Sequence, residues 1–259
     1  MILKASKKNK AKRKLQWLKD INMREKIEIL YEDEDIIVVY KPAKIATQTG
    51  KIGEKDVESF LKNHIYKQRK VRQAPYLAVI HRLDQPVEGV LVFAKNKSAA
   101  KELNRQLQTK GFGKEYKAVV CGELPKEKGR LRDYIVKDPQ ANRAFICEKN
   151  RDKAKEAVLY YDLLEKRKDG TNLVHICLET GRFHQIRIQM ANIGCPLLGD
   201  AKYNPMTESS GRWEQIALCA YKLKFEHPGT GKWMEFEIRP RGEGFKVLES
   251  RLDKESKIP

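Results

Sequence analysis

HRLDQPVEGVLVFAK, residues 81–95, places three polar side chains, His81, Arg82 and Asp84, between two apolar runs. The run before it is YLAVI (76–80) and the run after it is GVLVFA (89–94), and both predict strands of a buried sheet. Asp84 is therefore expected in a loop at the edge of that sheet. An aspartate in such a loop can also simply cap a turn, so this residue alone does not indicate chemistry.

The apolar pattern predicts further strands and helices along the chain. Strands are predicted over 35–42, 115–122, 156–165, 171–179, 215–227 and 232–240, with a turn at 228–231 joining the last two. Helical spacing predicts helices over 55–65, 97–111 and 181–194, with Gly111 as the C-cap of the second. Strands and helices do not alternate regularly, so we expect an α+β fold with a mixed, largely antiparallel sheet and flanking helices.

The charge balance indicates a polyanionic partner. The 259 residues include 53 Lys and Arg against 35 Asp and Glu, which gives a net charge of +18. Such an excess attracts nucleic acid. Residues 1–19 contain eight basic residues and no acidic one. We expect residues 1–26 to be a flexible basic extension, 27–250 one folded domain and 251–259 a tail. The extension either contacts phosphates or serves solubility alone.

Several classes of protein are disfavoured by the composition. No apolar run approaches the ~18 residues of a membrane-spanning helix, and no signal-peptide core is visible, so we expect a cytoplasmic protein without membrane contact. The cysteines contain no C-x-x-C pair, which argues against a disulfide framework and a zinc site. We expect them to be small buried hydrophobic residues: Cys121, Cys147, Cys177, Cys195 and Cys219.

Two other stretches give Asp84 more weight. GKEYKAVV (113–120) brings Tyr116 into a strand, although a tyrosine there is usually part of the core. TGRFHQIRIQMANIGCPLLGD (180–200) crowds polar side chains into the start of a predicted amphipathic helix, namely Arg182, His184, Gln185 and Arg187. This crowding beside a core face indicates either an anion site or a buried carboxylate partner.

These three blocks, in this order, resemble the signature blocks of the RluA family of pseudouridine synthases. EDIIVVYKPAKIA (34–46) resembles the opening strand motif of that family, and IALCAYKLKFEHPGTGKWMEFEIRP (216–240) resembles its closing one. The resemblance implies a pseudouridine-synthase-type catalytic domain over residues 27–250. It also implies an isomerase that converts uridine in ribosomal or transfer RNA to pseudouridine without a cofactor or metal. We expect a monomer.

Carried over by position, the resemblance assigns roles to single residues. Asp84 matches the catalytic aspartate, and Tyr116 matches the tyrosine that stacks against the target base and assists proton transfer. Arg187 matches the arginine that pairs with the aspartate, and Arg82 matches a residue thought to fill the gap left by the flipped base. The remaining residues predicted to bind RNA are Lys41, His81, Arg182, His184 and Gln185.

The resemblance leaves the route and the substrate open. The carboxylate could add to the anomeric carbon, add to carbon 6 of the base, or remove the sugar 2′ proton. Four positions depart from the family pattern: Lys44 replaces a glycine, Val87 and Glu88 replace Thr and Ser, and Cys219 replaces a histidine. These departures bear on the pocket rim and therefore on the substrate. The alternatives are an enzyme that releases the base and a catalytically silent RNA-binding or ribosome-assembly protein.

Overall fold

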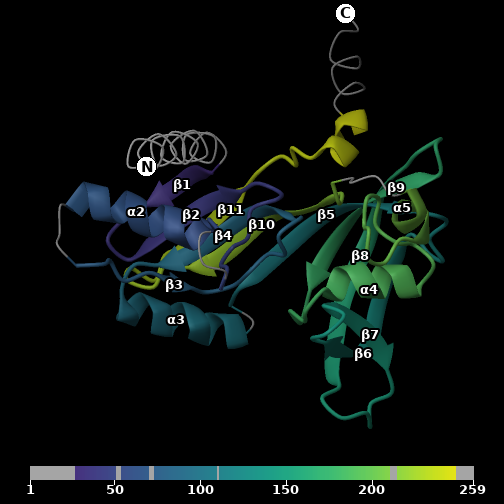
Figure 1. The fold of residues 1–259 in the computed structure, drawn as a ribbon, viewed down its shortest axis with the longest axis horizontal. Helices are drawn as coiled ribbons and strands as arrows, with labels where there is room; N and C mark the ends of the chain where they lie inside the picture. Colours follow the sequence, from purple (N-terminus) through teal and green to yellow (C-terminus); the bar gives the residue numbers. More distant parts are fainter. Residues whose placement is uncertain (1–26, 51–53, 70–72, 110, 211–214, 249–259) are drawn as a thin grey trace, which may run out of the picture.

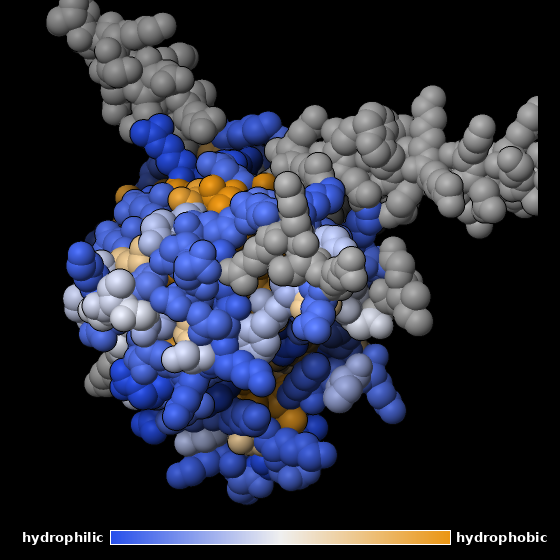
Figure 2. All heavy atoms as spheres, turned by 90° about the vertical axis from the view of Figure 1, so that its left-hand side faces the viewer, coloured by the Kyte–Doolittle hydropathy of each residue, from blue (hydrophilic) through white to orange (hydrophobic). Residues whose placement is uncertain are grey.

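The computed structural model describes residues 27–50, 54–69, 73–109, 111–210 and 215–248. The predicted basic extension and the predicted C-terminal tail lie outside the described residues. Within them no helix is long and apolar enough to cross a membrane. Hydrophilic side chains cover most of the face seen in Figure 2, in keeping with the 34% of charged residues.

The described strands form one continuous sheet, with helices on both sides (Figure 1). In chain order the elements are β1 (Glu28–Glu32), β2 (Ile36–Lys41), α2 (Val57–Arg69), β3 (Ala78–Val79), β4 (Glu88–Ala94), α3 (Lys97–Gln108), β5 (Gly113–Cys121), β6 (Lys128–Asp138), β7 (Arg143–Cys147), β8 (Lys155–Lys166), β9 (Thr171–Leu178), α4 (Gln185–Asn192), α5 (Pro205–Ser210), β10 (Leu218–Glu226), β11 (Trp233–Glu237) and a 3-10 turn at Glu243–Leu248.

The sheet order is β1-β2-β4-β10-β5-β9-β8-β6-β7, with β11 paired to β10 and β3 paired to β4. Every pairing is antiparallel except that of β4 with β10. The structure therefore confirms the expected α+β fold with a mixed, largely antiparallel sheet. β2 and β4 are buried along their whole length, which explains their continuous apolar sequences.

Two apolar clusters cover the two faces of the sheet. One contains Leu61 of α2 together with Tyr116 of β5 and Ile186 of α4. The other contains Leu103 of α3 and Tyr221 of β10. Since successive residues of a strand point to opposite faces, β5 and β9 contribute side chains to both layers.

Some boundaries differ from the sequence predictions. The helix predicted over 97–111 ends at Gln108, and Thr109 caps it in an extended conformation by donating its backbone N–H to Arg105 and Gln106 carbonyls. Gly111 as its C-cap was therefore wrong. The predicted strand 76–80 shortens to β3, and α4 begins at Gln185 rather than at 181 because His184 takes a left-handed conformation with φ 54°.

Gly89 allows the parallel contact of β4 with β10. It lies opposite Ala220 with φ +145°, a conformation that L side chains rarely adopt. A Cβ at this position would lie 2.5 Å from the Ala220 carbonyl oxygen. Close approach of the two backbones here brings the loop before β4 over the centre of the sheet.

Replacing Gly89 by alanine should lower the free energy of unfolding by at least about 3 kcal/mol, because backbone strain and steric overlap add. The matched control is Gly113→Ala, where a Cβ meets Lys224 atoms no closer than 3.5 Å. Urea denaturation of both variants checks this. Equal stabilities for the two variants would contradict the close contact of β4 with β10.

Candidate active site

Asp84 lies in the loop between β3 and β4, and hydrogen bonds from other segments fix the backbone of this loop on both sides of it. Thr47 Oγ1 accepts from the Leu83 backbone N–H and donates to the Leu83 carbonyl, at 3.2 and 3.0 Å. Fully buried Lys41 donates from its Nζ to the carbonyl oxygens of Pro42, Ile45 and Gln85, at 3.0, 2.7 and 3.2 Å. Three carbonyl acceptors match the three donors of an ammonium group. The backbone on either side of Asp84 is thus fixed before any ligand binds.

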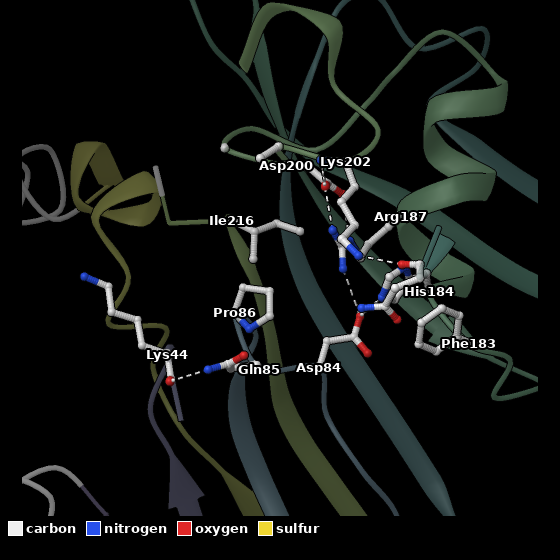
Figure 3. A pocket seen from close by; sticks show the side chains of 13 residues that line it. Lys44, Asp84, Gln85, Pro86, Phe183, His184, Arg187, Asp200, Lys202 and Ile216 are labelled. Carbon is white, nitrogen blue, oxygen red and sulfur yellow. Dashed lines mark hydrogen bonds and ion pairs between the residues drawn. The ribbon is translucent and has the colours of Figure 1, made fainter. Parts of the chain in front are cut away.

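Arg187 of α4 lies between two carboxylates (Figure 3). Its Nε and Nη2 donate to the two oxygens of Asp200 at 2.8 and 2.6 Å, and its Nη1 donates to Asp84 Oδ2 at 3.2 Å. The side chains of Arg187 and Asp200 are 5% and 0% exposed, whereas that of Asp84 is 27% exposed. The guanidinium therefore forms a bidentate ion pair with Asp200, and its remaining nitrogen, Nη1, donates one hydrogen bond to Asp84.

Arg187, Asp84 and Asp200 together carry one more negative charge than positive charge. One guanidinium faces two carboxylates, so the group is negative overall when both are ionised. Burial raises the pKa of Asp84; Arg187 and Lys41 oppose that rise, and the charge of Asp200 adds to it. Of the two carboxylates, Asp84 is therefore the one whose charge the guanidinium matches less fully.

His184 contacts Asp84 from the other side. Its Nε2 lies 3.4 Å from Asp84 Oδ2, and its Nδ1 lies 2.8 Å from the Tyr203 hydroxyl. The Tyr203 oxygen accepts from the Ala144 backbone N–H, so its own proton is free to go to Nδ1. Burial, with Arg187, Lys202 and Lys137 nearby, lowers the pKa of His184 to about 3. This network assigns a neutral imidazole that carries its proton on Nε2, facing Asp84.

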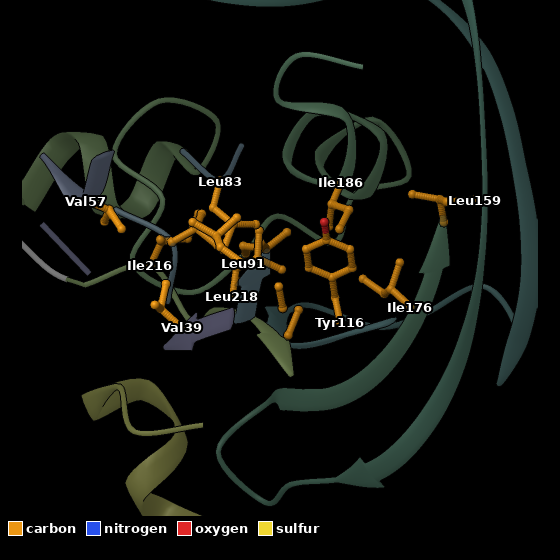
Figure 4. Close-up of a cluster of buried hydrophobic side chains, with 14 of the residues drawn as sticks. Val39, Val57, Leu83, Leu91, Tyr116, Leu159, Ile176, Ile186, Ile216 and Leu218 are labelled. Atoms are coloured by element: carbon orange, nitrogen blue, oxygen red, sulfur yellow. The ribbon is translucent and has the colours of Figure 1, made fainter. Parts of the chain in front are cut away.

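Tyr116 forms an apolar wall of the site. It lies on β5 in the cluster with Ile176, Ile186 and Leu218 (Figure 4) and is 7% exposed. Burial raises the pKa of its hydroxyl, and the charge of Asp84 acts in the same direction. Tyr116 therefore presents an aromatic ring and a protonated hydroxyl to the site at neutral pH.

Two cavities meet at Asp84. The larger has a volume of about 590 Å³, within the range of small-molecule sites, and Lys44, Asn142, Phe183 and Lys202 line it together with Asp84. The smaller, about 70 Å³, is lined by Arg82 and Tyr116. Both also include His184 and Arg187. A ligand bound at Asp84 would meet an aromatic wall on one side and cationic side chains on the other.

The other residues predicted to bind RNA separate into two groups. Exposed Arg82 and Arg182 line the smaller cavity, as does Gln185, whose amide bonds to Thr180, Arg182 and Val158. Lys41 and His81 line neither cavity. His81 accepts a bond from the Val92 N–H, and its ring packs edge-on against Phe112 at 5.3 Å. A direct RNA contact by Lys41 or His81 stays a prediction that this placement does not favour.

The positions that depart from the family pattern have separate structural roles. Lys44 has φ 73°, which explains why a glycine suits this position, and it lines the larger cavity. Val87 lines the smaller cavity. Glu88 is buried and accepts from the Tyr40 hydroxyl and the Arg241 and Gly242 backbone N–H groups. Cys219 is fully buried in β10.

Sequence reasoning missed the partners that orient the predicted residues. Asp200 is fully buried, and Tyr203 and Lys202 follow it closely in the chain. The available signal was the sequence LLGD (197–200), which places a carboxylate directly after an apolar run. Among the described residues, one group of potential metal ligands converges, Glu115 with His175 and Cys177, and it lies away from Asp84.

Comparisons with known proteins identify the family to which this chain is similar. Residues 35–192 match the family model described as RNA pseudouridylate synthase. The chain is 36% identical over 239 residues to an uncharacterized RNA pseudouridine synthase of Aquifex aeolicus, covering 89% of this chain and 74% of that protein. It is 34% identical to ribosomal large subunit pseudouridine synthase D of Vibrio cholerae, over 81% of this chain and 66% of that protein.

The fold is also similar to a solved structure. Human RNA pseudouridylate synthase domain containing 4 superposes with a TM-score of 0.71 at 22% identity, over 87% of this chain and 93% of the human one. At this identity the likeness concerns the fold.

Arg187→Ala should lower the free energy of unfolding by about 3–5 kcal/mol, because it leaves the buried Asp200 carboxylate without its partner. Chemical denaturation measures the loss. The control is Arg182→Ala, since Arg182 is exposed and should change stability far less. Wild-type stability in Arg187→Ala would show that the Arg187–Asp200 pair is not buried.

His184 should stay neutral as the pH falls to about 4. A histidine whose folded pKa lies below its unfolded value gives stability that is present above pH ~6.5 and is lost as the pH falls toward the folded pKa. Long-range nitrogen–proton NMR spectra, assigned with His184→Gln, report the tautomer and the titration. A midpoint near 6.5, or a proton on Nδ1, would contradict the network described above.

Proposed function

This chain belongs to the RNA pseudouridylate synthase family, and from that premise we propose that it isomerises a uridine of ribosomal RNA with Asp84 as the catalytic carboxylate. Membership makes the protein an isomerase that acts on RNA. The observation that carries the assignment of Asp84 is that it receives one hydrogen bond from Arg187, whereas Asp200 receives two. Arg187 is already held by Asp200, so Asp84 has a guanidinium neighbour without being fully neutralised.

The reaction must break the N1–C1′ bond, turn the uracil and form a C5–C1′ bond. The proton lost from C5 is balanced by one gained at N1, so the mass of the RNA does not change. Asp84 acts at C1′, at C6 or on the 2′ proton, and all three routes use an ionised carboxylate. Arg187 favours that ionised form, and the neutral His184 offers it a further donor through Nε2.

Tyr116 and the exposed arginines beside the smaller cavity have further roles in the proposed reaction. The detached uracil must be retained while it turns, and the ring of Tyr116 gives it a flat apolar surface. Flipping the base out of a helix costs a few kcal/mol. Arg82 and Arg182 are exposed beside the smaller cavity and are suited to phosphate contacts or to filling the vacated gap.

Ribosomal RNA is the substrate that the similar proteins support. The Vibrio cholerae relative is named for the large ribosomal subunit. A net charge of +18 suits a large folded polyanion, and Lys44 and Lys202 at the larger cavity extend that charge to the site. Transfer RNA is the competing substrate within the same activity.

Mapping pseudouridine in total RNA from cells with and without this gene tests the proposal. We expect one or a few uridines of large-subunit ribosomal RNA to lose modification and to regain it when the wild-type gene is restored. Loss confined to transfer RNA would replace the substrate but keep the activity. No lost site in any RNA, together with unimpaired RNA binding, would instead favour a silent binding or assembly protein.

Asp84→Asn should abolish turnover, a loss of at least about 10³-fold, while RNA affinity changes little, because the shape is kept and the charge is removed. Single-turnover assays and filter binding measure the two effects. The control is Asp152→Asn, an exposed aspartate whose neighbour is Lys153. Pseudouridine formation by Asp84→Asn at the wild-type rate would remove Asp84 from catalysis.

A further inference from the structure

A second cluster of reactive side chains lies on the other face of the central strands. Glu115 on β5 is directly opposite Cys177 on β9, and His175 precedes Cys177 by two residues on the same face. Their neighbours Tyr116 and Ile176 point the other way, into the cluster that lines the active site. The three side chains therefore lie behind the active site, separated from it by the sheet.

We propose that Glu115, His175 and Cys177 form a zinc site that joins β5 to β9. His175 Nε2 lies 2.8 Å from Glu115 Oε2 and 3.6 Å from Cys177 Sγ, and the three ligand atoms all lie within 4.8 Å of one another. Tetrahedral zinc, with Zn–S about 2.3 Å and Zn–N or Zn–O about 2.0–2.1 Å, separates its ligands by roughly 3.3–3.6 Å. A half-ångström opening of the carboxylate–imidazole pair is enough to admit the ion.

The donor set fits zinc in charge and in chemistry. A thiolate and a carboxylate together neutralise a divalent cation, and the neutral imidazole supplies a third ligand. Three protein ligands leave a fourth position for water. The thiolate disfavours magnesium and calcium, which prefer oxygen ligands.

Other polar and charged groups surround the three ligands. Asp162 Oδ2 lies 3.8 Å from His175 Nδ1, the nitrogen that faces away from Glu115, which is an electrostatic contact beyond hydrogen-bond distance. The Tyr221 hydroxyl donates to Glu115 Oε2 at 3.0 Å. Lys117 pairs with His175 across the two strands and places a cation on the same face, with its Nζ 4.3 Å from the centre of the Tyr221 ring, and this charge acts against a bound metal ion.

Cys177 would bind the ion as a thiolate, so zinc binding would displace the thiol proton. The spacing of cysteines along the chain gave no sign of this site, because its ligands come from two strands. The alternating His175-Ile176-Cys177 was the available signal.

Cobalt titration of the metal-stripped full-length protein tests the proposal without using catalytic activity. We expect one equivalent of Co²⁺ to give the near-ultraviolet band of a thiolate-to-cobalt charge transfer and Zn²⁺ to displace it. Cys177→Ser should remove the band, and His175→Ala should weaken Zn²⁺ binding by at least 100-fold.

The matched control is Cys147→Ser, a second half-buried cysteine that lies on β7. This variant should keep the band and the affinity. Should Cys177→Ser fail to fold, Glu115→Gln replaces it, with binding again expected to weaken by at least tenfold. No charge-transfer band in the wild type, a band that survives Cys177→Ser, or a Zn²⁺ affinity that Glu115→Gln leaves unchanged would overturn the proposal. The cluster would then be a hydrogen-bonded network only.

Discussion

The bidentate ion pair of Arg187 with Asp200 is the interaction on which the candidate active site depends. Both side chains are buried, and the two bonds of 2.8 and 2.6 Å fix the guanidinium plane. Removing either partner leaves an uncompensated charge, at a cost of about 3–5 kcal/mol. Asp84, by contrast, receives only one bond from the guanidinium, at 3.2 Å, and is partly exposed. A rigid, nearly neutral pair therefore lies beside a carboxylate whose charge is only partly matched, and this is the carboxylate that we propose as catalytic.

Asp84 is positioned by close backbone contacts of the sheet and of the loop before β4, and these contacts require particular residue types. Gly89 lets β4 run parallel to β10, and the buried ammonium of Lys41 holds the preceding loop through carbonyl oxygens. Tyr116 reaches the same space from β5, while the adjacent Glu115 points to the opposite face. One strand thus supplies the aromatic wall of the candidate active site and a ligand of the proposed zinc site. The two sites share their scaffold and differ in their chemistry.

Elements with a clear local sequence pattern could be predicted from the sequence, whereas features that depend on long-range contacts could not. β2 and β4 were recognisable from continuous apolar runs. The family resemblance selected Asp84, Tyr116 and Arg187, which line one cavity in the structure, and their catalytic roles stay predictions. β6 and β7 were missed, because exposed charged side chains interrupt the apolar pattern of β6. Asp200 was missed because a single carboxylate gives no periodic signal. The helix predicted over 181–194 was too long, because no local sequence signal indicates the left-handed conformation of His184, which precedes the first residue of α4.

The measurement that tests this account most directly is the pH dependence of the single-turnover rate at saturating RNA, for the wild type and for Asp200→Asn. Burial and the charge of Asp200 raise the pKa of Asp84, so the acidic limb of the wild-type profile should lie above the ordinary carboxyl value of about 3.9. Removing the Asp200 charge should move that limb to lower pH, provided that both proteins remain folded. An acidic limb at the same pH in both proteins would contradict the view that the Arg187–Asp200 pair sets the charge of Asp84.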